Sequence, residues 1–350
     1  MGTSNSPEKY LVTGGAGYIG SVVATMLVEA GHDVVVLDDC STGRAEAVPD
    51  GAALVRARVH DAADVLTGDF DAVFHFAGLI AAGESMTDPE IYWDNNTVGT
   101  LALLSAMREA GVPRLVFSST AAVYGDPQRL PIDEDAATAP TNTYGATKLA
   151  ADYAIASQAT AHGLAAASLR YFNVVGAYRD ERGLWHGERH EPETHLIPLA
   201  LQAAAGERDM LKLFGDDYDT VDGTCVRDYI HVADLARAHL LAVDQVTPGV
   251  HKVFNLGNGA GFSNRQVVET IEAVTGLTVP LEKAPRRPGD PATLVASSER
   301  AQRELGWRPE KPALADMVAD AWKFGDAVRR IQTDKPGVDA GRRRRAGNTA

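Results

Sequence analysis

The sequence predicts an α/β fold, in which a doubly wound parallel sheet is joined to a smaller α/β lobe. Three observations lead to this prediction. Short apolar segments alternate with helical ones through the first half of the chain, which is typical of βαβ units. A glycine-rich turn directly follows the first apolar segment. After about residue 175 the alternation gives way to a long polar segment, which indicates a second lobe.

The first half supplies the elements of the parallel sheet. We expect its strands at residues 9–13, 33–38, 53–57, 72–76, 114–119 and 166–171. The helices between them are expected at 18–31, 88–111 and 143–162.

The second half mixes shorter strands with helices and is expected to be partly interwoven with the first. Its strands are predicted at 211–214, 227–232 and 253–257. Its helices are predicted at 195–206, 233–246, 263–275, 298–305 and 312–325. The arginine-rich end of the chain, residues 331–350, is typical of a disordered basic tail.

Composition excludes several classes of protein. The formal net charge of −14 argues against binding to nucleic acid or to an anionic membrane. No apolar run is long enough to span a bilayer. Two cysteines, Cys40 and Cys225, form no disulfide framework, so a cytoplasmic protein is the simplest interpretation. No metal site is predicted.

The glycine-rich turn predicts a dinucleotide site. Gly14 permits a tight turn, Gly17 lets the backbone approach a pyrophosphate, and Gly20 allows close packing of the helix on the sheet. The helix beginning at Tyr18 and Ile19 directs its positive end at that pyrophosphate. Asp38 ends the second strand, where an acidic side chain binds the adenosine ribose and favours NAD over NADP.

A Tyr-x-x-x-Lys pair predicts redox chemistry with a tyrosine that handles the proton. Tyr144 and Lys148 are four residues apart and share one face of a helix. An ammonium group beside a tyrosine lowers its pKa toward the working pH. Ser118 and Thr120 end an apolar strand, where hydroxyl groups face the ligand crevice of a doubly wound sheet. We therefore predict residues 1–175 as an NAD-binding Rossmann-type domain.

Arginines in the second half indicate an anionic substrate. Arg227 follows a Gly-Thr-Cys-Val segment, and Arg286 and Arg287 precede Asp290. A guanidinium fork suits a diphosphate, and a carboxylate suits a ribose hydroxyl. Residues 176–330 are accordingly predicted to be mainly a substrate lobe.

These motifs, in this order, resemble those of the extended short-chain dehydrogenase/reductases, and among them the UDP-glucose 4-epimerases. The resemblance runs from about residue 9 to 325 and includes the segments 12–20, 75–79, 83–85, 94–96, 123–125, 170–173 and 226–231. It implies reversible 4-epimerisation of UDP-glucose and UDP-galactose through a transient 4-keto intermediate, with tightly bound NAD. It also implies a homodimer formed through the helices at 88–111 and 143–162.

The resemblance assigns roles to individual residues. The catalytic group comprises Tyr144, Lys148 and Thr120. The cofactor-binding residues are Gly14, Gly17, Tyr18, Ile19, Gly20, Asp38, Phe76, Ala77, Gly78, Asn95, Ser118, Tyr144, Lys148 and Tyr171. The substrate-binding residues are Thr120, Tyr144, Phe172, Asn173, Leu196, Phe214, Arg227, Tyr229, Arg287, Asp290 and Leu294.

The chain departs from the family pattern at several positions. Thr120 replaces a frequent Ser and keeps the hydroxyl group. Ile80 replaces a frequent Lys, and Arg58-Val59 stands where an Asp is common near the adenine, so some NAD contacts are missing. Leu294 occupies the pocket-wall position, where a Tyr excludes N-acetylated sugars and a small residue admits them.

Other functions remain open at this point. The chain could be another NAD-dependent nucleotide-sugar epimerase, acting on UDP-N-acetylhexosamines or UDP-pentoses. A dehydratase is disfavoured because Thr120 is followed by Ala121 and Ala122, without the acidic residue that elimination needs. A non-catalytic NAD-sensing regulator is disfavoured because both Tyr144 and Lys148 are present.

Overall fold

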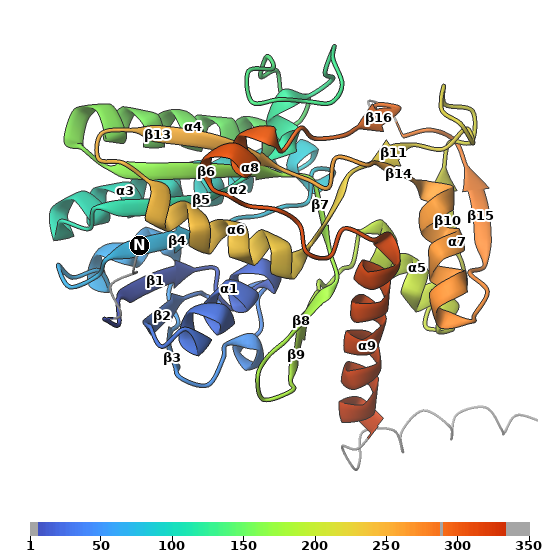
Figure 1. Ribbon diagram of the computed structural model, residues 1–350, viewed down its shortest axis with the longest axis horizontal. Coiled ribbons are helices and arrows are strands. Elements are labelled where there is room, and N and C mark those ends of the chain that lie inside the picture. The colour runs from blue at the N-terminus through green and yellow to red at the C-terminus, as the bar shows by residue number, and fades with distance from the viewer. Residues whose placement is uncertain (1–5, 288–289, 334–350) are drawn as a thin grey trace, which may run out of the picture.

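A seven-stranded parallel sheet forms the centre of the molecule (Figure 1). The computed structural model describes residues 6–287 and 290–333. The strands follow the order β13-β6-β5-β4-β1-β2-β3. Their bounds are β1 Lys9–Thr13, β2 Asp33–Leu37, β3 Ala52–Val55, β4 Ala72–His75, β5 Arg114–Thr120, β6 Ala165–Tyr171 and β13 His251–Leu256. The predicted doubly wound parallel sheet is therefore confirmed.

Helices cover both faces of the sheet. On one face lie α1 (Tyr18–Glu29), α6 (Val232–Gln245) and α8 (Glu299–Glu304), and on the other lie α3 (Gly99–Ala110) and α4 (Thr143–His162). Successive β1 side chains alternate between the two cores: Tyr10 and Val12 enter the first, and Leu11 enters the second. Burial on both faces explains why the strands read as continuous apolar runs.

The strand order places a topological switch between β1 and β4. From β1 the chain proceeds to β2 and β3 on one side, then returns to β4 on the other. The connections on the two sides diverge there, and they leave a crevice at the carboxyl ends of the strands, where ligands of such folds bind.

A smaller lobe stands beside the carboxyl edge of the sheet, at the right of Figure 1. It has its own core, to which α5, α7 and α9 contribute. The bounds of its helices are α5 Leu196–Ala204, α7 Asn264–Thr275 and α9 Leu314–Thr333. Short pairs of strands complete it: β10 Leu211–Phe214 with β15 Leu281–Ala284, β7 Asn173–Val175 with β12 Tyr229–His231, β8 Ala177–Arg179 with β9 Trp185–Gly187, and β11 Val226–Arg227 with β14 Phe262–Ser263 and β16 Thr293–Leu294.

The two halves of the chain share elements. Strand β13 and helices α6 and α8 come from the second half but pack into the sheet layers of the first. The chain thus passes from the larger lobe to the smaller one near residue 175, and it returns to the larger lobe twice after that point. The division into domains stays a prediction.

Three predicted elements differ from the structure. The helix at 88–111 is interrupted: α2 (Pro89–Tyr92) and α3 are joined by a π-helical turn at Trp93–Val98. The strand at 227–232 is split at Asp228 into β11 and β12, which belong to different sheets. Helix α9 extends past the predicted residue 325 to Thr333.

The polar segment after residue 176 holds the β8–β9 hairpin, which was not predicted. Most of the predicted basic tail lies outside the described residues. Within the described part of the chain, no helix is long and apolar enough to cross a membrane.

Candidate active site

The turn between β1 and α1 forms a tight cradle against the end of β4. Gly14 has a φ of +71°, and a Cβ there would lie 2.5 Å from the backbone nitrogen of Ala77. A Cβ on Gly20 would collide with the carbonyl group of Gly14. Gly17 is the N-cap of α1 and provides no side-chain cap, so the positive end of this helix is open to an anion. The backbone here fits a pyrophosphate.

Asp38 lies beside this cradle at the end of β2. Its carboxylate accepts hydrogen bonds from the N–H groups of Ala16, at 2.9 Å, and Cys40, at 2.8 Å. Burial raises the pKa of Asp38, while these two hydrogen bonds act in the opposite direction. Each carboxylate oxygen has a second lone pair. The position suits the predicted contact with a ribose hydroxyl.

The segment after β4 forms the next part of the site. A Cβ on Gly78 would lie 2.8 Å from Oδ1 of Asn96 and 3.3 Å from Nζ of Lys148. Asn96 accepts a hydrogen bond from the N–H of Leu79 at 2.8 Å and donates one to its carbonyl oxygen at 3.0 Å. Glycine at position 78 therefore lets the β4 end lie directly against the ammonium group of Lys148.

The first turn of α4 is fixed at three points. Its N-cap Asn142 accepts a hydrogen bond from the N–H of Gly145 at 2.8 Å. The N–H of Tyr144 donates to Oγ of Ser85 at 3.0 Å. Gly145 packs so closely on the turn after β5 that a Cβ would lie 2.6 Å from the carbonyl oxygen of Ala122. These contacts set the position of Tyr144.

The predicted catalytic residues come together at the carboxyl end of β5. The hydroxyl group of Thr120 lies near that of Tyr144 and acts to lower the pKa of the phenol, against the effect of burial. Lys148 is buried, and its Nζ donates to the carbonyl oxygen of Ser118 at 3.0 Å and lies 4.9 Å from the centre of the Phe117 ring. A proton-accepting phenol, a second hydroxyl group and an ammonium group thus face one crevice.

Burial controls the pKa values of this group. It lowers the pKa of Lys148 to about 8, although the carboxylate of Asp152 acts in the opposite direction. It raises the pKa of Tyr144, and the nearby hydroxyl group of Thr120 offsets only part of this rise. The expectation that Lys148 lowers the pKa of Tyr144 was therefore wrong for the protein alone, because desolvation of the phenolate dominates.

Tyr171 forms a wall of the crevice. Its hydroxyl group forms a short hydrogen bond with Oγ of Ser118. The ring of His239 contacts both Tyr171, at 6.0 Å between centroids, and Phe76, at 4.8 Å. Burial lowers the pKa of His239 to about 4, so this wall is uncharged at neutral pH. It suits the flat face of an aromatic ring.

Cationic side chains line the part of the smaller lobe that faces the crevice. Arg227 is largely buried and pairs with Asp290 at 3.4 Å. Arg287 lies over the ring of Phe214, 4.1 Å from its centre. Stacking holds the guanidinium plane in place while leaving its N–H groups free to bind phosphate.

Three further predicted residues lie near Arg227 or pack with its strand partner. Leu294 is paired with Arg227 across β11 and β16, and it packs with Phe172 on a small cluster that includes Val123. Asn173 donates its Nδ2 to the carbonyl oxygen of Asp228 at 3.0 Å, and a second hydrogen on that nitrogen remains.

The structure directs the side chains of five predicted site residues elsewhere. Tyr229 lies in the core of the smaller lobe with 4% exposure, and Leu196 packs on the same core. Asn95 donates to the carbonyl oxygen of Ile91, one turn earlier in its own helix, at 2.8 Å. Tyr18 donates its hydroxyl to the carbonyl oxygen of Gly176 at 2.7 Å, and Ile19 packs on the core of the sheet, so only their backbones border the cradle.

Several residues that shape the site were not predicted. Asn96 and Ser85 hold the backbone on either side of Lys148, and His75 links β4 to Thr13 at 2.6 Å and to Thr100 at 2.9 Å. Asn96 and Ser85 belong to segments that the family resemblance included, so that signal was available. No sequence signal gave the hydrogen-bonding role of His75.

The two departures near the cofactor site are resolved by the structure. Arg58 forms an ion pair with Asp94 at 2.5 Å, which ties the segment after β3 to the π-helical turn. The side chain of Ile80 is exposed. Neither residue disrupts the cradle around Gly14.

Comparison with known proteins identifies this arrangement. A sequence profile described as the NAD dependent epimerase/dehydratase family matches residues 10–257. The UDP-glucose 4-epimerase of Corynebacterium glutamicum is 57% identical over 322 residues, which cover 91% of this chain and 96% of that protein.

Solved structures agree with the sequence comparison. UDP-glucose 4-epimerase from Brucella ovis in complex with NAD is 44% identical and has a TM-score of 0.86, over 91% of this chain and 98% of that one. The Stenotrophomonas maltophila enzyme, with bound NAD and formylated UDP-arabinopyranose, is 41% identical and has a TM-score of 0.87, over 93% and 99% of the two chains. Sequence and fold together show that the chain belongs to the NAD dependent epimerase/dehydratase family.

Proposed function

We propose that this protein is an NAD-dependent isomerase that interconverts UDP-glucose and UDP-galactose by reversible 4-epimerisation. The observation that carries the proposal is the grouping of Tyr144, Thr120 and the buried Lys148 beside a dinucleotide cradle. Relatives of similar sequence and fold are named UDP-glucose 4-epimerases, and that name describes the same reaction.

The residues of the larger lobe suit NAD. The Gly14 turn and the open end of α1 hold the pyrophosphate, Asp38 the adenosine ribose, and Lys148 the nicotinamide ribose. When bound, NAD supplies a hydride acceptor that becomes the donor in the return step. A positive charge beside Tyr144 would favour the phenolate and would offset the effect of burial on its pKa.

Tyr144 acts as the catalytic base. It accepts the proton of the sugar 4′-hydroxyl group, either directly or through Thr120, as the C4 hydrogen leaves as hydride. The product of this step is a 4-ketose. The ketose turns within the pocket and presents its other face, after which hydride returns to C4 and Tyr144 gives back the proton.

The smaller lobe holds the part of the substrate that does not react. Arg227 and Arg287 bind the diphosphate, Phe214 contacts the uracil, and Asp290 accepts a hydrogen bond from the uridine ribose. Such remote contacts retain the ketose while the hexose is held loosely enough to turn. Apolar Leu294 and Phe172 border the hexose and give it few fixed partners.

One incubation tests this function. Purified protein, without added NAD, is expected to convert UDP-galactose to UDP-glucose, with both separated by ion-exchange chromatography. Acid release of the bound nucleotide is expected to yield NAD and no NADP, because Asp38 disfavours a 2′-phosphate. No conversion by protein that contains NAD would overturn the proposal.

Leu294 raises a second candidate substrate class, the UDP-N-acetylhexosamines. A leucine leaves more room than a tyrosine but gives the polar atoms of an acetamido group no partner. We expect UDP-galactose to be the better substrate and UDP-N-acetylgalactosamine to react more slowly. Leu294→Tyr is expected to abolish the slower reaction and preserve the faster one. Equal loss of both would show that Leu294 is not the gate.

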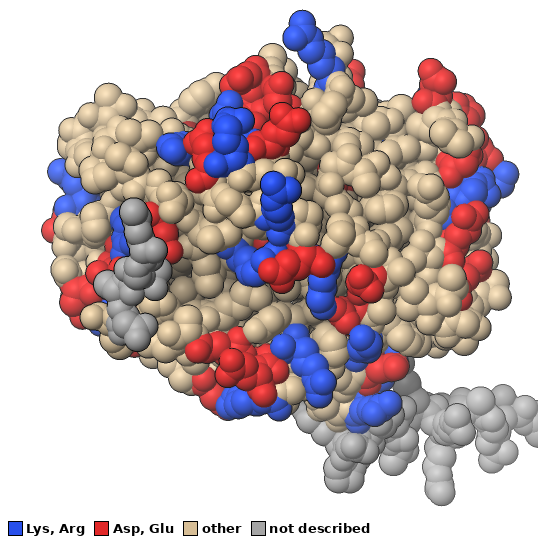
Figure 2. Space-filling model, viewed as in Figure 1, with Lys and Arg blue, Asp and Glu red and all other residues tan. Residues whose placement is uncertain are grey.

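A homodimer is part of the proposal. Helices α3 and α4 pack side by side, and their outer surface carries exposed apolar side chains from α2, the π-helical turn and both helices: Ile91, Trp93, Val98, Leu101 and Tyr153. Figure 2 shows a stretch without charged side chains at the far upper left, over the left end of α4, whereas charges of both signs gather along the lower edge. Such a surface suits a second copy.

We also propose that the protein acts in the cytoplasm. Cys40 and Cys225 are both free thiols, and Cys225 is buried. A reducing compartment is consistent with this state.

A further inference from the structure

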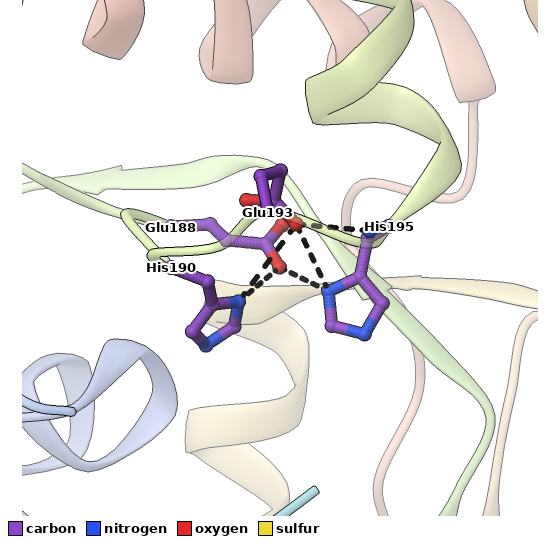
Figure 3. A group of neighbouring side chains, drawn as sticks. All are labelled: Glu188, His190, Glu193 and His195. Atoms are coloured by element: carbon purple, nitrogen blue, oxygen red, sulfur yellow. Dashed lines mark hydrogen bonds and ion pairs between the residues drawn. The ribbon is translucent and has the colours of Figure 1, made fainter. Parts of the chain in front are cut away.

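Two glutamates and two histidines converge in the segment between β9 and α5. Figure 3 shows Glu188, His190, Glu193 and His195 with their polar atoms directed toward one another. One ligand atom from each lies within 4.8 Å of the others. None of the four belongs to the proposed catalytic or substrate-binding group.

The distances fit a single small ion. Nδ1 of His190 lies 2.9 Å from Oε1 of Glu188 and 4.0 Å from Oε1 of Glu193. Nδ1 of His195 lies 3.7 Å from Oε1 of Glu193 and in close contact with Glu188. In a tetrahedral zinc site with bonds of about 2.0–2.1 Å, neighbouring ligand atoms are about 3.4 Å apart. The observed separations lie on both sides of that value.

Burial and pairing give a second, independent indication. The side chains of Glu188 and Glu193 are only 7% and 6% exposed. Two carboxylates this close and this buried repel each other unless a cation lies between them. Nδ1 of His190 is buried and has no hydrogen-bond partner of acceptable geometry. A buried nitrogen that faces two carboxylates without a hydrogen bond to either is the arrangement expected of a metal ligand.

The surroundings also support metal binding. Oε1 of Glu193 accepts hydrogen bonds from the N–H groups of Thr194, at 2.7 Å, and His195, at 2.9 Å, and these bonds fix the orientation of the carboxylate, as hydrogen bonds to a metal-binding carboxylate do. A cavity of about 260 Å³ borders Glu188, His190 and Glu193 and provides access for an ion.

We propose that these four side chains bind one divalent transition-metal ion, Zn²⁺ being the best match to two imidazoles and two carboxylates. All four tetrahedral positions are filled by protein, so the ion is structural. It fastens the loop at 188–195 between the β8–β9 hairpin and the start of α5. This proposal departs from the expectation, drawn from the sequence, that the chain holds no metal site.

Metal titration of the full chain, expressed without a polyhistidine tag, tests the proposal. After treatment with a chelator, the protein is expected to bind about one equivalent of Zn²⁺ in calorimetry. With Co²⁺ it is expected to show the intense visible absorption of a tetrahedral site. Zn²⁺ is also expected to raise the Tm, because an ion that binds only the native state stabilises it.

Matched variants locate the ion. Glu193→Gln and His195→Gln are expected to weaken Zn²⁺ affinity by at least about tenfold, whereas Glu191→Gln, in the same loop, and His162→Gln, on α4, leave it unchanged. His195 is 45% exposed, so its replacement preserves packing even if Glu193→Gln does not fold. Absence of saturable binding in the parent protein, or equal loss in the control variants, would overturn the proposal. The four side chains would then hold the loop in place through ion pairs alone, without a metal ion.

Discussion

The position of one phenol group depends on residues that never touch a ligand. Asn142 caps α4, Ser85 accepts the N–H of Tyr144, and Gly145 admits the carbonyl group of Ala122. Together they bring the hydroxyl of Tyr144 to Thr120 without a flexible element. Proton transfer falls off steeply with distance, so this fixed backbone matters as much as the side chain itself.

Tyr144→Phe removes the proton acceptor and almost no volume. We expect turnover of UDP-galactose to fall on the order of 10²–10⁴-fold, with UDP binding nearly unchanged. Steady-state kinetics and calorimetry with UDP measure the two quantities. Tyr153→Phe, on the exposed face of the same helix, is the control and keeps full turnover. A loss below about tenfold would assign the proton to another base.

Thr120 is expected to act through its hydroxyl group alone. Thr120→Ala removes the hydroxyl group beside Tyr144 and should lower turnover by at least about tenfold, because the proton then loses its relay. Thr120→Ser keeps that group and should retain turnover within about threefold. Equal effects of the two substitutions would point instead to the Thr methyl group and to packing.

The lowered pKa of Lys148 predicts the direction in which the free energy of unfolding changes with pH. The folded pKa of about 8 lies below the ordinary value of 10.5, so between these values the unfolded chain binds more protons. Unfolding free energy of the NAD-free protein should therefore rise with pH across this window, relative to Lys148→Met, by on the order of 1–3 kcal/mol.

Urea titrations of both proteins at several pH values measure this difference, which should be constant below about pH 8. Lys212→Met, which changes an exposed lysine on β10, serves as the control. A flat difference between pH 8 and 10.5 would mean that Lys148 titrates in the folded state as an exposed lysine does.

At the scale of single elements, the helix predicted at 88–111 shows that apolar periodicity can predict a helix but cannot predict a local change in its winding. Its apolar spacing predicted a helix, and α2 and α3 are there. The π-helical turn at Trp93–Val98 shifts the phase by one residue and turns Asn96, in place of Asn95, toward Gly78. Two adjacent asparagines look alike in sequence, and only the local winding separates their roles.

The strand predicted at 227–232 is divided by a buried acid. The Asp228 carboxylate accepts hydrogen bonds from the N–H groups of Asn258, at 2.6 Å, Gly259, at 2.9 Å, and Ala296, at 3.0 Å. It thereby joins three segments of the smaller lobe and sends Arg227 and Tyr229 into different sheets. The β propensity of the segment was informative, but the partners of Asp228 lie too far along the chain to be predicted.

Asp228→Ala should leave those three N–H groups buried without acceptors. We expect the free energy of unfolding to fall by on the order of 3 kcal/mol, as measured by urea denaturation. Asp222→Ala, which removes a partly exposed acid from the neighbouring loop, should cost less. Loss of less than about 1 kcal/mol at Asp228 would show that water replaces the carboxylate.

For the whole molecule, the alternation of elements was enough to predict the sheet, and the glycine and Tyr-x-x-x-Lys motifs were enough to predict its ligand edge. The sequence did not show how the smaller lobe closes over that edge. Leu294 reaches Phe172 through contacts that span more than a hundred residues, and the bridge between Ile132 and Ala296 does the same. Such pairings depend on tertiary packing, for which local patterns carry no signal.

Assembly is expected to depend on the apolar surface of α3 and α4. Light scattering should give twice the chain mass for the parent protein. The double variant Leu101→Glu/Tyr153→Glu should give the mass of a monomer, because charge is then buried in the interface. Leu281→Glu, an exposed apolar position on β15, is the control and stays dimeric. A monomeric parent protein at micromolar concentration would contradict the proposed homodimer.

The return of β13 to the edge of the sheet has a consequence during synthesis. The first six strands of the sheet are translated in order, but β13, the last neighbour of β6, is translated only after the first part of the smaller lobe. Until Leu256 has emerged, β6 presents an open strand edge that can pair with other chains. A nascent chain stalled before that residue is therefore the form most in need of a chaperone, and release of the stall completes the sheet.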